Sequence, residues 1–447
     1  MKQNRANFST KLGVIAAAVG SAIGLGNIWR FPYETGAHGG GAFILVYIFF
    51  VIIIGIPLIC SEFIIGRSSQ SNVLGAFKKL QPKHSKWHWV SFVGIISSLM
   101  ILSFYSVVAG WTLEYGVQSI TGGLGVGKQQ LSQNFTVFTT QTMRPLLWTL
   151  VFLLCNYLIM RRGLKNGIER MSNIMMPLLF VILIVFCINS LMMPKASEGL
   201  SFLFVADFSE ITPSVFLSAM GQAFFSLSLG VSTLITYSSY YGKDVRLVRS
   251  ASIVAGLDTL FAIIAGLIIF PALFSFDLEP TAGPKLVFEV LPFIFSQTTG
   301  GDIWAASFFF LLFLASITST ISMAEISIAF FQEELKMTRE KASMLCIGIA
   351  MTFGSLCALS FGPLSDMTIF GKTIFEFFDF TTANLLMPTC GILFSIFAGW
   401  IIDKNIVRNQ LTNEGSVRVY TYRLIVFCLR WVAPCAILSV LVFQLIK

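Results

Sequence analysis

Long apolar runs separated by short polar intervals make up most of this 447-residue chain. A helix needs about 20 consecutive apolar residues to cross the hydrocarbon core of a bilayer, so each run predicts one transmembrane helix. About eleven such helices are predicted, over residues 12–35, 41–65, 89–118, 145–161, 168–191, 214–240, 250–275, 303–332, 342–361, 370–402 and 421–446. The pattern therefore predicts an all-α polytopic membrane protein, with residues 1–447 forming a single domain within the lipid bilayer.

Three longer intervals, 119–144, 192–213 and 276–302, are expected on the outer side of the membrane. The last one contains an apolar stretch, 286–295, which is too short to cross the bilayer and is interrupted by Pro292. We expect this stretch to cover the outer face as a broken hairpin.

The composition agrees with a membrane protein, because 55% of the residues are hydrophobic and 12% are charged, against roughly 25% charged in a soluble domain. The formal net charge is +8, and most of the 30 Lys and Arg residues fall on the loops that share a side with the N-terminus. This asymmetry follows the positive-inside rule and predicts a cytoplasmic N-terminus and, after an odd number of crossings, a C-terminus outside. The basic charge thus reflects topology, and we expect no nucleic-acid partner.

Two predicted spans carry small and polar residues in the middle of an apolar run, at 19–27 and at 224–231. For one span alone, close helix packing would be the preferred explanation. However, the two spans occupy corresponding positions, each at the start of a set of five. Interrupted helices in corresponding halves indicate a transporter with a binding site near the bilayer midplane. We therefore predict a first repeat at 12–191, an inverted second repeat at 214–402 and an extra helix at 421–446.

Ionisable side chains inside a span suggest function, because each costs about 2.5–3.5 kcal/mol or more at a helix centre. Asp258 lies in the middle of its run, where a structural contact with a neighbouring helix and a cation-binding role are equally compatible with its position. Glu325 and Glu376 are expected to face a wet crevice and are assigned no role. The other ionisable residues singled out within the predicted spans are Arg30, Glu62 and Asp379.

Several spans carry hard oxygen ligands, which suit a hard ion such as sodium better than a transition metal. For any single hydroxyl, a hydrogen bond to the preceding helical turn is the simpler explanation, and it weakens only if all of them line one cavity. The residues concerned are Asn27, Ser226, Asp258, Thr318 and Ser319.

Motifs that would indicate an enzyme or a nucleotide-binding protein are incomplete. The stretch 122–128 matches the start of a phosphate-binding loop, but Gln129 replaces the required Ser or Thr and no strand precedes it. The sequence contains neither a His-Glu-x-x-His nor a Gly-x-Ser-x-Gly motif. We therefore expect neither nucleotide binding nor enzymatic activity.

Six segments carry a resemblance to a known family: 22–32 (AIGLGNIWRFP), 39–43 (GGGAF), 162–163 (RG), 167–170 (GIER), 221–230 (GQAFFSLSLG) and 315–320 (ASITST). In these segments, and in their order along essentially the whole chain, the sequence resembles the neurotransmitter:sodium symporters. The resemblance implies a 5+5 inverted-repeat, leucine-transporter-type fold with helices 1 and 6 unwound, in the eleven-helix bacterial form of the inner membrane. It also implies sodium-coupled symport of an L-amino acid by alternating access.

The resemblance further implies two sodium ions beside one substrate. Sodium site 1 would consist of Ala22, Asn27, Ser226 and Asp258, and sodium site 2 of Gly20, Ile23, Ala315, Thr318 and Ser319. The amino-acid substrate would contact Ala22, Leu25, Gly26, Ile101, Tyr105, Phe225, Ser226, Ser228, Val231, Ser319 and Met323. An outer gate would join Arg30 and Asp379, and an inner gate would involve Arg5, Tyr240 and Glu333. Glu62 would support the unwound part of helix 6.

Departures from the family pattern refine these expectations. Phe8 stands where a Trp is usual, and Glu333 where a shorter acid is common, so the inner gate would differ in geometry. Asp258 replaces an Asn found in many relatives, and Ala262 lacks the hydroxyl that chloride-dependent members use. We expect Asp258 to supply the negative charge that chloride provides elsewhere, so that no chloride is needed.

The residues implied for the substrate side chain are apolar except for Ser228, and none of them could pair with a charge. Val231 is smaller than the aromatic residue of some relatives and leaves room for a bulky group. We therefore expect a hydrophobic or aromatic amino acid. The alternatives are a membrane sensor that binds an amino acid without moving it, against which the sequence carries no appended signalling domain, and a passive channel. Nothing in the pattern favours one oligomeric state.

Overall fold

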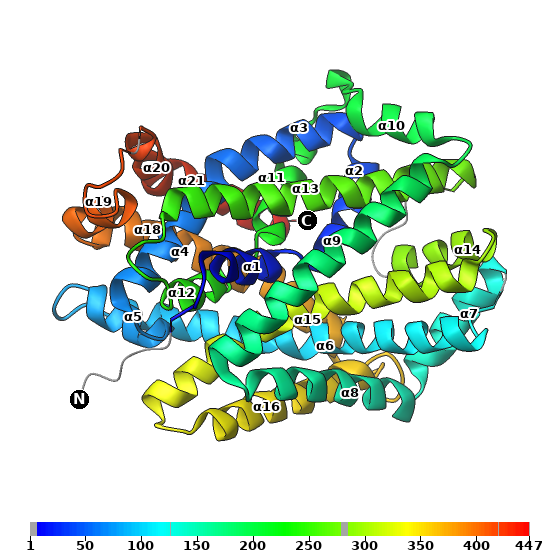
Figure 1. Ribbon diagram of the computed structural model, residues 1–447, viewed down its shortest axis with the longest axis horizontal. Helices are drawn as coiled ribbons and strands as arrows, with labels where there is room; N and C mark the ends of the chain where they lie inside the picture. The colour runs from blue at the N-terminus through cyan, green and yellow to red at the C-terminus, as the bar shows by residue number, and fades with distance from the viewer. Residues whose placement is uncertain (1–6, 126, 279–284, 419, 447) are drawn as a thin grey trace.

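The computed structural model describes residues 7–125, 127–278, 285–418 and 420–446, and these are almost entirely helical (Figure 1). By length and hydropathy, nine helices of the described residues could each cross a membrane, and a tenth span is the helix pair Lys11–Ala22 and Gly26–Ala37, bent by 53°. The predicted span 214–240 is divided into Pro213–Ser226 and Thr233–Ser238, each too short to be counted. The all-α polytopic fold is thus confirmed, and both spans predicted to be interrupted are broken.

The spans consist of α-helices and, where labelled η, of π-helical turns. In chain order they are α1 (Lys11–Ala22), η1 (Gly26–Arg30) and α2 (Phe31–Ala37); α3 (Gly41–Phe50), η2 (Val51–Gly55) and α4 (Ile56–Ser69); α6 (Val90–Thr121); α8 (Met143–Met160); η4 (Leu164–Glu169) and α9 (Arg170–Leu191); α11 (Pro213–Ser226) and α12 (Thr233–Ser238); α13 (Leu247–Ser275); α15 (Gly301–Glu334); α16 (Arg339–Leu359); α17 (Ile374–Phe380), η7 (Thr381–Leu386), α18 (Met387–Ile396) and η8 (Phe397–Ile401); and α20 (Tyr422–Phe427), η9 (Cys428–Val432) and α21 (Ala433–Ile446).

Shorter elements connect the spans. They are α5 (Val73–Leu80), the 3-10 turns η3 (Trp87–Trp89) and η5 (Phe208–Glu210), α7 (Lys128–Thr140), α10 (Ala196–Phe204), η6 (Leu286–Val290), α14 (Leu291–Ser296), α19 (Lys404–Leu411), and the antiparallel strands β1 (Thr368–Ile369) and β2 (Lys372–Thr373). The broken hairpin predicted at 286–295 is wrong, because η6 and α14 form one short apolar helix, Leu286–Ser296, that packs on α7 and α15. Pro292 lies within this helix, where the π-helical turn η6 joins α14.

The predicted spans match the helices to within a few residues, and some of the differences lie at charged helix ends. The span predicted from residue 342 begins at Arg339, because the hydroxyl of Thr338 accepts a hydrogen bond from the backbone N–H of Lys341 and caps the helix. An apolar run cannot reveal such a polar first turn.

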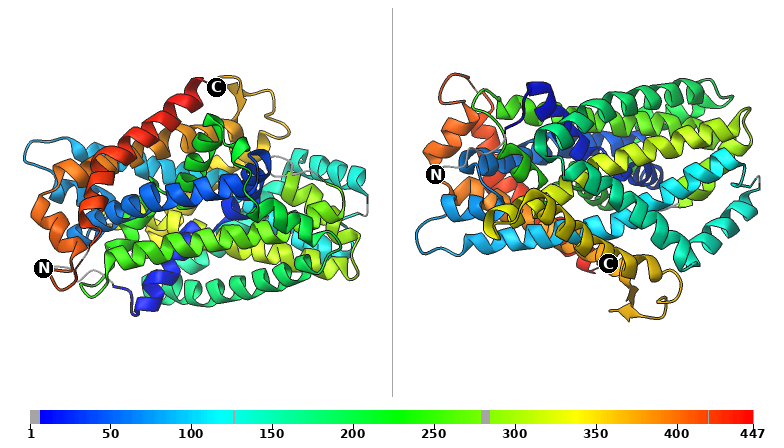
Figure 2. Two further views of the ribbon diagram at one scale, coloured as in Figure 1. Left: turned by 90° about the horizontal axis from the view of Figure 1, so that it is seen from above. Right: turned by 60° about the horizontal axis from the view of Figure 1, so that its bottom comes forward.

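The two broken spans lie inside the bundle. α1 packs against α9, α12, α13 and α15, and Figure 1 shows it in the middle of the molecule. The long helices α6 and α15 pack along each other, and α8 and α16 pack against α6. The last helix, α21, lies on the outside against α11 and α18 (Figure 2). The bundle therefore holds both breaks away from lipid.

Polar groups within the bundle replace the hydrogen bonds that each break gives up. In the first break, the Gly24 N–H donates to Asn27 Oδ1 over 3.0 Å. In the second break, the Gly230 N–H donates to Glu62 Oε1 over 2.9 Å, which is the support predicted for Glu62. Gly230 has a φ of +79°, in the left-handed region, and a Cβ there would run into the backbone carbonyl of Met387.

Candidate functional site

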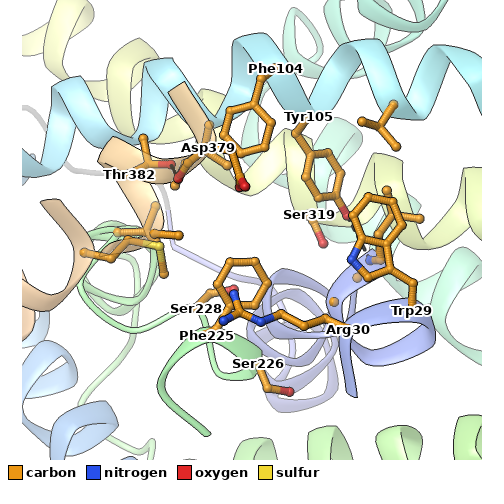
Figure 3. Close-up of a pocket in the computed structure, with 18 of the residues that line it drawn as sticks. Trp29, Arg30, Phe104, Tyr105, Phe225, Ser226, Ser228, Ser319, Asp379 and Thr382 are labelled. Carbon is orange, nitrogen blue, oxygen red and sulfur yellow. Dashed lines mark hydrogen bonds between the residues drawn. The ribbon is translucent and has the colours of Figure 1, made fainter. Parts of the chain in front are cut away.

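A cavity of about 340 Å³ lies between the two breaks, α6, α15 and the α17–η7 segment (Figure 3). The structure brings together at its wall all eleven residues predicted to contact the substrate, from four separate spans: Ala22, Leu25, Gly26, Ile101, Tyr105, Phe225, Ser226, Ser228, Val231, Ser319 and Met323. Most of the wall is apolar, and its polar groups lie at the two breaks and on the neighbouring α2, α6, α15, α17 and η7. Such a cavity suits a small molecule with one polar and one apolar end.

Two glycines keep the floor of this cavity open. A Cβ on Gly24 would lie 2.8 Å from Ser319 Oγ and 2.9 Å from the Tyr105 hydroxyl, and a Cβ on Gly26 would lie 2.9 Å from the Phe225 ring. The Tyr105 hydroxyl accepts a hydrogen bond from the Leu25 N–H at 3.0 Å. The glycines thus let α6, α15 and the second break approach the main chain of the first break.

The carboxylate of Asp258 is fully buried at the edge of the cavity, where α13 meets both breaks. Its Oδ1 accepts from Asn27 Nδ2 at 2.8 Å, its Oδ2 accepts from Ser226 Oγ at 2.6 Å, and the Tyr47 hydroxyl approaches Oδ2 at 3.4 Å. All three donors are neutral, and no ion pair of the described residues includes Asp258. A buried carboxylate surrounded by neutral donors is stabilised by a bound cation.

Three of the four residues predicted for sodium site 1 are therefore in direct contact, and the fourth, Ala22, lines the same cavity. The Asn27 amide turns its nitrogen toward Asp258, while its Oδ1 accepts from Gly24. For Asn27 to ligate a cation at this point, its amide oxygen rather than its nitrogen must face that cation.

The residues predicted for sodium site 2 also meet, at the contact between α1 and α15. Ser319 Oγ donates to the carbonyls of Ile23 at 3.0 Å and Ala315 at 3.2 Å, and Thr318 Oγ1 donates to Ala315 at 3.0 Å. A Cβ on Gly20 would lie 3.4 Å from the Thr318 side chain. Two hydroxyls and nearby carbonyls form an uncharged set of oxygen ligands for a hard cation.

The two predicted outer-gate residues lie on opposite walls of the cavity (Figure 3). Arg30 stacks over the Phe225 ring, with its guanidinium carbon 4.4 Å from the ring centroid, and its Nε lies 3.7 Å from Glu34 Oε1. No ion pair of the described residues joins Arg30 to Asp379. The predicted Arg30–Asp379 pair is therefore not formed in the described part of the chain, and the outer gate stays a prediction.

The predicted inner-gate residues make other contacts in the described part of the chain. Arg5 lies outside the described residues. Glu333 Oε2 accepts from the main-chain and side-chain nitrogens of Asn72, both at 2.9 Å. The Tyr240 hydroxyl donates to Glu325 Oε1 at 2.7 Å, and the ring of Phe8 packs edge-on against that of Tyr240.

The expectation that Glu325 faces a wet crevice is wrong. Its side chain is fully buried and forms a bidentate ion pair with Arg339, with Nη2–Oε2 at 2.6 Å and Nη1–Oε1 at 2.8 Å. Arg339 Nε also donates to the Met160 carbonyl at 2.8 Å. With these bonds the pair ties α8, α15, α16 and Tyr240, which follows α12, together. The apolar pattern gave no signal because Arg339 lies outside the predicted span.

Sequence reasoning also missed part of the cavity wall. The missed residues include Trp29, Glu34, Phe104, Val108, Phe375, Thr382 and Asn384. Helical spacing around the predicted residues would have found some of them. Phe375 lies four residues before Asp379 and Thr382 three residues after it, so all three share one face of a helix.

The family model described as Sodium:neurotransmitter symporter family matches residues 5–144 and 128–447. The sodium-dependent transporter YhdH of Bacillus subtilis (strain 168) is 40% identical over 98% of this chain and 97% of its own length. A sodium-dependent transporter of Haemophilus influenzae is 36% identical over 99% of both chains.

A solved structure has a similar fold. The crystal structure of MhsT in complex with L-phenylalanine superposes with a TM-score of 0.90 at 43% identity, covering 98% of this chain and 99% of that one. The similarity to these relatives, in sequence and in fold, thus extends over nearly the whole chain.

Proposed function

Since this chain belongs to the sodium:neurotransmitter symporter family, we propose that it imports an L-amino acid with a hydrophobic or aromatic side chain together with two sodium ions, by alternating access. The family consists of sodium-dependent transporters, and the helices of this chain are long and apolar enough to cross a membrane repeatedly. The proposed location is the bacterial inner membrane with the N-terminus cytoplasmic and the C-terminus outside. The inverted repeats proposed are 12–191 and 214–402.

The observation that carries the proposal is the Asp258 carboxylate, buried beside the cavity without a positive partner among the described residues. A sodium ion bound to Asp258, Asn27, Ser226 and the Ala22 carbonyl would neutralise it and face the cavity. An amino-acid carboxylate could then complete the shell of the ion. Sodium would favour substrate binding because the ion attracts the substrate carboxylate as well as Asp258 in a dry site.

The second ion would sit between the hydroxyls of Thr318 and Ser319 and the carbonyls of Gly20, Ile23 and Ala315. These ligands come from α1 and α15 and carry no charge. An ion there would hold the first broken helix against α15, so its loss would free that helix to move. This would couple the ion to the opening of the inner gate at Arg5, Tyr240 and Glu333, while Arg30 and Asp379 close the outer side.

The cavity supports an apolar amino acid. The side-chain pocket of Ile101, Phe225, Val231 and Met323 is apolar, with Ser228 as its polar member. A charged side chain would have no counter-charge among these five. That MhsT, at 43% identity, is seen with L-phenylalanine supports the same preference in this chain.

The test is binding and uptake of L-phenylalanine by the purified chain in proteoliposomes, in sodium and in choline buffer. We expect sodium-dependent binding and accumulation driven by an inward sodium gradient. D258N should weaken the sodium dependence, whereas D302N, at the exposed start of α15, should not change it. Equal binding in choline and in sodium would refute the proposal, and sodium-dependent binding without accumulation would identify a sensor.

Chloride independence is a separate part of the proposal. Asp258 would provide the fixed negative charge beside sodium site 1, and the empty carrier would return with Asp258 protonated. Uptake should therefore be unchanged when gluconate replaces chloride. A collapse of uptake in gluconate would refute this part while leaving sodium symport intact.

A further inference from the structure

Arg430 is a basic residue within the last apolar span, Tyr422–Phe443. Its Nε donates to the carbonyl of Gly399 at 2.7 Å, and its guanidinium carbon lies 5.0 Å from the centroid of the Trp400 ring. In the described part of the chain, this is the one hydrogen bond of the guanidinium, and no carboxylate pairs with it. The two terminal amino groups therefore keep four N–H donors for another acceptor.

The guanidinium lies at the level of a helix end. Gly399 is two residues before the end of η8, where the span that begins at Ile374 stops and exposed Asp403 and Lys404 follow. A Cβ on Gly399 would lie 3.1 Å from Arg430 Cγ, so the glycine lets the two spans cross closely. The C-terminal end of the helix that contains η8 carries a partial negative charge, which explains why its Gly399 carbonyl accepts the bond from Nε. This bond leaves the two terminal amino groups of the guanidinium without a partner among the described residues.

Aromatic rings exposed on the surface of the bundle lie next to this site, and that of Trp400 is in contact with the guanidinium. Trp400 is 49% exposed and Trp431 is 54% exposed, and the two rings pack edge to face at 5.2 Å. Phe427 is also exposed one turn before Trp431. η8 and η9 pack against each other on the outside of the bundle (Figure 2), so in a membrane these rings face lipid. Trp400 lies at the end of its span, and a tryptophan at a helix end marks the headgroup level of a bilayer.

We propose that Arg430, Trp400 and Trp431 form a binding site for one acidic phospholipid in the leaflet that the positive-inside pattern predicts to be cytoplasmic. The terminal amino groups of Arg430 bind the phosphate in the bidentate manner that suits a guanidinium. The rings pack against the glycerol backbone and the upper acyl chain. Exposed Arg423 and Lys404 lie on the same side and attract acidic lipid to this surface in general. A soluble phosphate would not use the rings.

The proposal can be tested by tryptophan fluorescence, because brominated acyl chains quench the fluorescence of a tryptophan that they contact. The full chain is reconstituted into phosphatidylcholine vesicles that contain brominated phosphatidylglycerol or, in parallel, brominated phosphatidylcholine. The quenching of these two tryptophans is obtained by subtracting the fluorescence quenching of the W400F/W431F variant from that of the unchanged chain. We expect the brominated acidic lipid to be preferred by about fivefold, as one arginine near the bilayer surface provides.

R430Q should abolish this preference, and R430K should reduce it because a lysine cannot bind in a bidentate manner. R423Q is the matched control on the same span and should retain the preference. Equal quenching by both lipids, an R430Q variant that keeps the preference, or an equal loss in R423Q would each overturn the proposal. Loss of the preference on adding inorganic phosphate would also overturn it, in favour of a free anion. None of these measurements depends on transport.

Discussion

Replacing Arg339 by Gln would leave the carboxylate of Glu325 buried without a positive charge. The Glu325 side chain is 0% exposed and that of Arg339 is 19% exposed, so the carboxylate cannot turn to water whereas the guanidinium partly can. Removing one partner of a buried ion pair costs about 3–5 kcal/mol. We therefore expect R339Q to lower the free energy of unfolding by that amount, and E325Q to lower it by less.

The double variant E325Q/R339Q should recover much of the loss, because two amides can bond to each other without a buried charge. The coupling energy should reach about 1–3 kcal/mol, which is the range for residues in one ion-pair network. The assay is reversible unfolding in mixed micelles, followed by tryptophan fluorescence and extrapolated linearly for the four variants of the cycle.

A second ion pair of α15 is the control for this cycle. Lys78 and Glu334 lie 3.2 Å apart, with side chains 49% and 27% exposed. K78Q should lower the free energy of unfolding by less than about 1 kcal/mol, because water screens an exposed pair. The reasoning is refuted if R339Q costs no more than K78Q, or if the two single losses simply add up in the double variant.

Two further predictions concern the cavity. G24A would place a Cβ 2.8 Å from Ser319 Oγ, and such overpacking costs about 1–3 kcal/mol. We therefore expect the Kd for the amino acid, measured by equilibrium binding, to rise about tenfold. The control is G256A, whose Cβ would meet nothing within 4 Å and should leave the Kd unchanged. E34Q would remove the carboxylate near Arg30 and release the guanidinium for the outer gate, so we expect slower substrate dissociation, by a factor of up to about five. Dissociation faster than in the unchanged chain would contradict this.

Local features of the sequence predicted the spans and the two breaks, and they marked Asn27, Ser226 and Asp258 as candidate oxygen ligands, whereas the grouping of these three residues in one site was expected only through the family resemblance. The span limits follow from the length of each apolar run, because the hydrocarbon core sets how many residues a helix needs to cross it. The breaks follow from small and polar residues that no lipid-facing helix would keep. The cavity wall formed by Leu25, Tyr105 and Phe225 was expected only through the resemblance of long motifs to a family.

Only the tertiary structure decided which side chains meet across the bundle. The pairing of Glu325 with Arg339, the contact of Arg30 with Glu34 and the bond from Arg430 to Gly399 all depend on how each helix is rotated and tilted. In a soluble protein, the apolar face of a helix reveals that rotation. In a membrane, lipid and protein interior are equally apolar, so the pattern marks where a helix crosses without marking which face it turns inward.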